Sequence, residues 1–186
     1  MSDTTTIDIP GYKPGTWVLD PAHSEVTFTV RHMMISRVRG TFGVKSATLT
    51  APANPLELEL TASVDAASVD TKDEGRDNHL RSADFFDVER FPTFEFRSTG
   101  VRLDGGDFLV DGDLTIHGVT RPVTFEVEFN GFGTDPWGNY KAGASAKTVV
   151  NREEFGLTWN AALETGGVLV GKDVTIELDL QGSLQQ

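Results

Sequence analysis

Five segments of this chain alternate apolar and polar side chains with a period of two residues, and this pattern constrains the fold more than any other feature. Successive side chains of a β-strand point to opposite faces, so each segment predicts a strand with one apolar and one polar face. The clearest case runs from Val174 to Gln181, where every second residue is Val, Ile or Leu. The segments span residues 25–31, 56–65, 108–116, 123–130 and 174–181. The sequence therefore predicts an all-β fold.

Glycine-containing turns punctuate the rest of the chain, for example at residues 104–106 and 166–167. Residues 73–87 differ from their surroundings, because they lack alternation and carry helix formers with acidic residues early. One or two short helices are predicted there, the second capped near Ser82. Further strands are predicted near residues 37–50, 91–103, 137–150 and 156–162.

About eight antiparallel strands of this kind can form a two-sheet sandwich or a closed barrel, and alternation alone does not choose between them. A barrel of ~8 strands has an interior that is either filled by side chains or holds one small ligand. Strands of ~9 residues would give it a lumen roughly 20–25 Å long, which suits a flexible lipid tail. The 186 residues are expected to form a flexible arm at 1–14 and a single domain at 15–186.

The apolar faces of the predicted strands are rich in phenylalanine. Walls of this kind bind flexible chains through dispersion and desolvation, without demanding one shape. The same side chains could instead fill an ordinary packed core, and composition alone favours that alternative. The residues concerned are Phe28, Phe42, Phe94, Phe96, Phe108, Phe125 and Phe129.

Four motifs follow one another along the chain, beginning with TWVLDPAHSEVTFTVRHMMISRVRGTF at Thr16–Phe42 and continuing at Glu74–Thr99, Gly112–Val123 and Asn151–Leu180. Together they resemble the signature of the YceI-like family, bacterial lipid-binding proteins often called polyisoprenoid-binding. The resemblance covers nearly the whole chain beyond residue 15. It implies an eight-stranded, lipocalin-like antiparallel barrel with one or two short helices, whose elongated apolar interior takes an isoprenoid or other amphiphilic chain.

With this resemblance, the inward-facing positions are interpreted as ligand contacts. We expect a non-enzymatic protein, without a cofactor, that sequesters or transports a polyisoprenoid, an isoprenoid quinone or a similar long-chain amphiphile. Burying even ten methylenes at ~0.8 kcal/mol each would hold a lipid without a strong polar anchor. The candidate ligand-binding residues are Phe28, Val30, His32, Met34, Phe42, Phe94, Phe96, Phe108, Leu114, Ile116, Phe125, Val127, Phe129 and Trp159.

Histidines invite a metal hypothesis, because His23, His32, His79 and His117 all fall within the four motifs. No pair of them has the HxH, HxxxH or HExxH spacing of a local metal site, so no metal site is predicted. The parity of the 25–31 strand points His32 inward near a barrel end, where it either meets a ligand head group or is satisfied by a protein neighbour. His117 precedes Gly118 and is expected to stabilise a turn.

Charged side chains concentrate in the segment without alternation, which carries Arg76, His79 and Arg81 beside Phe85 and Phe86. Such a cluster could gate the barrel mouth or meet a phosphate, since arginine offers bidentate recognition of that group. A solvated helix face is the simpler interpretation. We expect the segment to cap the tunnel, with its phenylalanines toward the lumen. Arg37 and Arg39 precede Gly40, where they either line another opening of the barrel or have only a structural role.

Catalysis finds little support in the sequence. The chain has no cysteine, which excludes thiol chemistry and disulfides, and it has neither a GxSxG elbow nor a glycine-rich phosphate loop. Ser24 neighbours His23, but adjacent residues of a strand point to opposite faces. No catalytic residue is predicted. The rival hypothesis is a small lipid hydrolase or metal-assisted enzyme that uses histidines at the barrel mouth.

A formal net charge of −12 argues against nucleic acid as a partner and predicts repulsion from an anionic membrane. No apolar run approaches the ~18–20 residues of a membrane span, so stable membrane insertion is not expected. As written, the N-terminus has no basic and apolar signal regions, which predicts a cytoplasmic protein. Proteins of the family that it resembles are often exported, and the resemblance also allows pairing into a homodimer.

Overall fold

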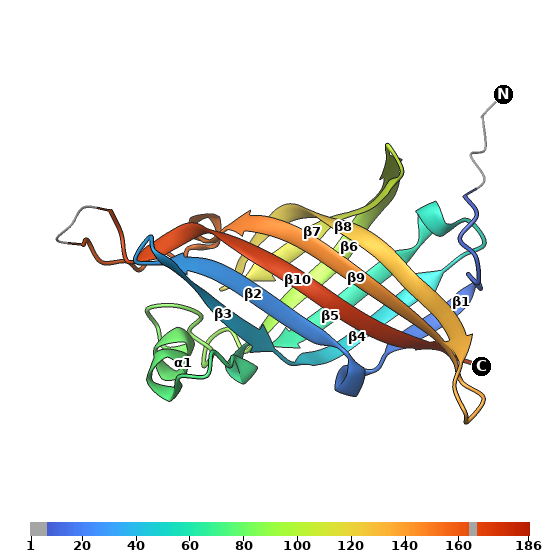
Figure 1. Ribbon diagram of the computed structural model, residues 1–186, viewed down its shortest axis with the longest axis horizontal. Helices are drawn as coiled ribbons and strands as arrows, with labels where there is room; N and C mark the ends of the chain where they lie inside the picture. The colour runs from blue at the N-terminus through green and yellow to red at the C-terminus, as the bar shows by residue number, and fades with distance from the viewer. Residues whose placement is uncertain (1–6, 164–166) are drawn as a thin grey trace.

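Ten β-strands form one antiparallel sheet that closes on itself in the computed structural model, which describes residues 7–163 and 167–186 (Figure 1). The strands are β1 (Gly15–Leu19), β2 (Glu25–His32), β3 (Ser36–Phe42), β4 (Val44–Ala51), β5 (Glu59–Asp65), β6 (Thr93–Asp104), β7 (Asp107–Ile116), β8 (Val119–Thr134), β9 (Tyr140–Asn151) and β10 (Val170–Leu184). Their order is β1-β4-β5-β6-β7-β8-β9-β10-β2-β3, and a pairing of β1 with β10 closes the ring.

The ten strands occupy eight positions around the barrel. β10 pairs with β2 along residues 170–179 and with β1 along residues 182–184, so β1 and β2 share one position. A 3-10 turn at Pro21–His23 separates them, because proline cannot continue the ladder and Asp20 caps the turn by accepting from the Ala22 amide. β3 and β4 share a second position, on either side of Gly43. This arrangement confirms the eight-stranded antiparallel barrel.

Register places the apolar faces on the inside. Phe28 of β2 lies opposite Ile176 of β10 on one side and opposite Gly40 of β3 on the other. A side chain at residue 40 would overlap the Phe28 ring, so glycine makes room for it. Gly112 of β7 does the same for Phe96. Because a one-residue slip would turn every apolar side chain outward, this pairing fixes the inner surface.

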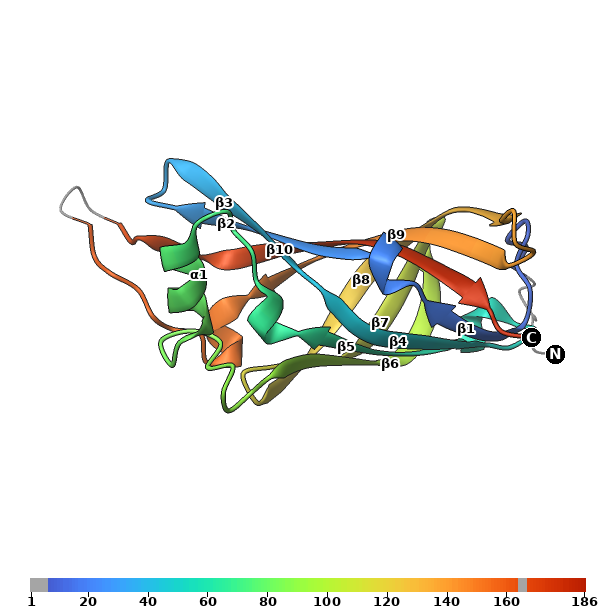
Figure 2. The same ribbon diagram turned by 90° about the horizontal axis from the view of Figure 1, so that it is seen from below.

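The helix α1 (Glu74–Arg81) lies beside the part of the barrel wall where, among the described residues, the outer edge of β3 has no strand partner. β3 is bonded to β2, but its other edge forms only a bridge from Thr41 to Asp70, in the segment after β5. Asp73 caps α1 by accepting from the Arg76 amide. We call this end of the barrel, with α1 and the β2–β3 turn, the helix end (Figure 2).

Of the one or two helices predicted over residues 73–87, one forms; residues 82–87 make a turn, in which the Phe85 and Asp87 amides both donate to the Ser82 carbonyl. Two strand predictions were wrong. Residues 156–162 do not form a strand, since the buried Arg152 side chain takes up the carbonyls of Leu157 and Trp159. The strand predicted from residue 56 begins only at Glu59, after a 3-10 turn at Pro55–Glu57.

The opposite end of the barrel is covered by the segment that precedes β1. The Tyr12 hydroxyl donates to the Pro52 carbonyl at 2.6 Å, and the Tyr140 hydroxyl donates to the carbonyl of Gly11. We call this end the tyrosine end. Of the arm expected at 1–14, residues 1–6 lie outside the described part, whereas residues 9–13 are held by these contacts and by the bond from Trp17 Nε1 to the Lys13 carbonyl. Within residues 7–163 and 167–186, no helix is long and apolar enough to cross a membrane.

Candidate ligand cavity

The barrel encloses a cavity of about 600 Å³, to which all ten strands contribute side chains. This volume lies in the range of pockets that hold small ligands. The phenylalanines predicted to face inward all line it: Phe28, Phe42, Phe94, Phe96, Phe108, Phe125 and Phe129. The aromatic side chains therefore form walls around an open space, and they do not fill the barrel completely.

Small side chains on β9 keep one wall of the cavity thin. Ala144 lies between Phe129 of β8 and Leu180 of β10, and Ala146 lies between Val127 and Leu178. With Ala142, both alanines line the cavity. Sequence analysis missed them, because alanine contributes little to an apolar alternation. Their spacing of two residues in the stretch Lys141–Lys147 was the available signal.

All but one of the candidate ligand-binding residues line the cavity. Beyond the phenylalanines, these are Val30, His32, Leu114, Ile116, Val127 and Trp159. Met34 does not belong to the lining. The alternation of inward and outward side chains along β2 does not reach Met34, because the strand ends at His32. Met34 lies in the following turn with a positive φ of 60°. Its side chain is 56% exposed.

Polar groups that line the cavity gather at the helix end. Arg76 of α1 donates from Nε to the Thr71 hydroxyl and from Nη2 to the Thr71 carbonyl, both at 2.8 Å. The Thr71 hydroxyl in turn donates to the buried carboxylate of Asp77. His79 lies 2.9 Å from an Asp84 carboxylate oxygen. Of the charged segment, Arg76 and His79 thus line the cavity, whereas Asp77 and Asp84 are hydrogen-bonded to other residues.

Aromatic side chains surround His79 at this end. The ring centroids of His79 and Trp159 lie 4.7 Å apart, and Phe85 stands 5.1 Å from His79 and 5.3 Å from Trp159. Phe86 packs against Phe42 and Phe94 on the inner wall. Both phenylalanines of the 73–87 segment line the cavity, in the orientation that its predicted capping role requires.

Arg152 is the most buried cation of the cavity lining, with 5% of its surface exposed. It donates to four carbonyl oxygens, those of Leu157, Trp159, Val170 and Gly171. Burial lowers the pKa of its guanidinium, and the charge of nearby Glu153 opposes that shift. An arginine nevertheless stays protonated in a protein, so it leaves a positive charge near this end of the cavity. Sequence analysis did not single it out.

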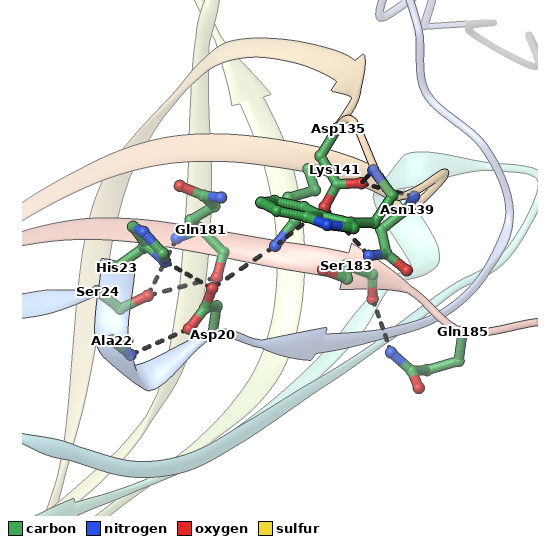
Figure 3. A network of polar contacts seen from close by, with 11 residues as sticks. Asp20, Ala22, His23, Ser24, Asp135, Asn139, Lys141, Gln181, Ser183 and Gln185 are labelled. Carbon is green, nitrogen blue, oxygen red and sulfur yellow. Dashed lines mark hydrogen bonds and ion pairs between the residues drawn. The ribbon is translucent and has the colours of Figure 1, made fainter.

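A polar network at the tyrosine end joins the β1–β2 junction to the start of β9 (Figure 3). Asp20 Oδ2 lies 2.7 Å from His23 Nδ1 and 3.5 Å from Lys141 Nζ, which also stands 4.0 Å from an Asp135 oxygen. The His23 bond is the largest of several contacts that lower the pKa of the Asp20 carboxyl. None of these residues lines the cavity, so the network holds the wall together from outside.

The four histidines lie in different surroundings. His23 belongs to the outer network, His32 and His79 line the cavity, and His117 sits in a turn with its ring 5.0 Å from that of Phe91. Across the described part of the chain, no three His, Asp or Glu side chains gather as metal ligands would.

A closed antiparallel barrel around an apolar cavity is the architecture of lipocalin-like proteins. The sequence profile of the YceI-like domain matches residues 17–182, and this chain belongs to that family. Among its curated relatives is UPF0312 protein SA2479 of Staphylococcus aureus, 39% identical over 172 residues, which are 91% of this chain and 98% of the relative.

Solved structures show the same fold. A YceI protein of Campylobacter jejuni matches with a TM-score of 0.70 and 26% identity, over 84% of this chain and 90% of its own. BcnA of Burkholderia cenocepacia matches with a TM-score of 0.75 and 24% identity, over 88% and 98%. A polyisoprenoid binding domain from Saccharophagus degradans has a TM-score of 0.68 and 15% identity, over 91% and 98%.

Proposed function

We propose that this protein binds one long-chain amphiphile, such as a polyisoprenoid or an isoprenoid quinone, and shields its apolar chain from water. The observation that carries the proposal is the composition of the cavity lining, most of which is Phe, Leu, Ile, Val and Ala. At ~0.8 kcal/mol per methylene, transfer of a long chain into such a lining supplies the driving force without a polar anchor. The Saccharophagus domain, described as polyisoprenoid-binding, supports this ligand class.

The arginine and histidine side chains at the helix end suggest how such a ligand is oriented. The lining residues Arg31, His32, Arg76, His79 and Arg152 lie at that end, whereas apolar side chains and Tyr12 line the rest. We infer that an oxygen-bearing head group lies toward the helix end and the apolar tail toward the tyrosine end.

We propose a binding and carrying role, without catalysis. Among the described residues, the lining contains no Ser, Thr, Asp or Glu, and the chain has no cysteine. Hydrolysis by protein side chains needs a nucleophile or a carboxylate beside the bound substrate. No observation favours the rival hydrolase or metal-assisted enzyme.

Filling the cavity tests the proposal. Ala144→Trp adds a large side chain beside Phe129 and Leu180, and we expect it to weaken binding of an apolar fluorescent probe by roughly tenfold or more. The matched control is Val149→Trp, on the outward face of the same strand and 57% exposed. Equal probe affinity in both folded variants would place the ligand outside the barrel.

A further inference from the structure

The turn between β2 and β3 exposes three consecutive apolar side chains at the helix end. Met33 is 42% exposed, Met34 56% and Ile35 83%. The Met33 amide donates to the Leu169 carbonyl at 2.7 Å, so the loop before β10 supports the turn, and Val168 of that loop is also exposed. Figure 2 shows the turn projecting beyond the strands next to α1. We call residues 33–35 the apolar tip.

The backbone conformation of the apolar tip does not favour the residue types that occupy it. Met33 and Met34 have φ values of 54° and 60°, the signs that a type I′ turn needs at both central positions. Asn-Gly is the favoured sequence for such a turn, because methionine is disfavoured in the left-handed region. Two methionines stand here against the local preference. The Met34 side chain packs over Gly167 of the loop before β10, and both methionines nevertheless remain exposed. A residue choice that breaks a local rule in this way points to a function for the side chains.

Three arginines flank the apolar tip on the same hairpin, and one of them, Arg31, also borders the cavity. Arg31 of β2 lies directly opposite Arg37 of β3, and Arg39 lies opposite Thr29. All three are exposed, and none lies within 4.0 Å of a carboxylate among the described residues. Like charges in neighbouring register positions repel each other, so this pairing is unfavourable for the hairpin alone. In a chain with a net charge of −12, it forms a local positive surface.

We propose that this hairpin docks the protein on a bilayer that contains anionic lipid. The apolar tip enters the interface between head groups and acyl chains, and Arg31, Arg37 and Arg39 lie against the anionic head groups. Screening limits the repulsion from distant acids, because the Debye length is about 8 Å at physiological ionic strength. His32, next to the tip, lines the cavity, so docking brings the helix end of the cavity to the membrane surface.

A bilayer fits this surface better than a protein or nucleic acid does. A convex tip of three residues is too small for a stable protein interface, which typically buries about 800 Å² per partner. Nucleic-acid binding would explain the arginines and leave the apolar tip without a role. Apolar anchors beside basic residues are the composition of interfacial membrane contacts. The proposal does not depend on which ligand the cavity holds.

Vesicle co-sedimentation of the full chain tests the proposal. We expect binding to vesicles of phosphatidylcholine mixed with phosphatidylglycerol, weaker binding to phosphatidylcholine alone, and loss of binding as salt rises. Replacing the tip by Met33→Asn, Met34→Gly and Ile35→Ser gives the turn its favoured sequence, so this variant keeps its melting temperature and loses binding. Each of Arg31→Gln, Arg37→Gln and Arg39→Gln is expected to weaken binding roughly fivefold.

Trp137→Ser provides the matched control, because Trp137 is 84% exposed in the β8–β9 turn at the tyrosine end. It should bind vesicles like the original protein. Unchanged binding in the tip variant, or loss of binding in the Trp137 variant alone, would overturn the proposal. Probe binding in the absence of vesicles reports on the cavity separately, so failure of the proposed ligand binding and failure of docking give different results.

Discussion

Side-chain size at a few inward positions decides how much of the barrel interior stays open. Gly40 and Gly112 admit the rings of Phe28 and Phe96, and the β9 alanines sit between larger residues of β8 and β10. Large and small side chains thus complement each other along the wall, as they do in a packed core. The small alanine side chains of β9 leave part of the barrel interior open.

The carboxyl group of Asp20 makes the stability of the fold depend on pH. Its pKa is lowered in the folded state, mainly by the bond to His23, so the unfolded chain binds the proton more tightly. The resulting stabilisation is present above the unfolded pKa of about 3.9 and is lost as pH falls through the lower folded pKa. We expect Asp20→Asn to lower the urea midpoint at pH 7 and to match the original protein at strongly acidic pH. An equal difference at both pH values would contradict this account.

At the scale of elements, most strands and the tight glycine turns between them were predictable, and the longer connections were not. Alternation identified the apolar face of β2, β7, β8 and β10, because solvent lies on one side of each strand. It could not identify the loop at residues 156–163, because Arg152 donates to the carbonyls of Leu157 and Trp159 there, and Asn160 donates to the carbonyl of Val170. Hydrogen bonds from one side chain to the carbonyls of a loop produce no periodic pattern in the sequence.

The elements at the helix end are expected to control ligand exchange. Trp159 is half-buried and rests on His79 and Phe85, so it closes the cavity without belonging to the main core. Trp159→Ala should speed both association and release of an apolar probe in stopped-flow measurements, while it lowers the free energy of unfolding by no more than about 2 kcal/mol. Trp137→Ala is the control at the opposite end. Exchange rates that stay unchanged in the folded Trp159 variant would move the entrance elsewhere.

At the scale of the whole molecule, net charge was a poor guide to local surfaces. A charge of −12 predicted repulsion from any anionic membrane, yet pairing of β2 with β3 places Arg31 opposite Arg37 beside the apolar tip. The closed barrel was predicted from the family motifs, because alternation alone is equally compatible with a two-sheet sandwich. The existence and volume of the cavity needed the structure, since they depend on which large and small residues face each other across strands.

Mass spectrometry of the organic extract from purified protein shows whether the barrel carries a long apolar chain. We expect one class of long-chain lipid in the original protein, and a reduced amount in the Ala144→Trp variant prepared in parallel. Absence of any lipid from the original protein, together with no uptake of a supplied polyprenol or quinone, would contradict this expectation.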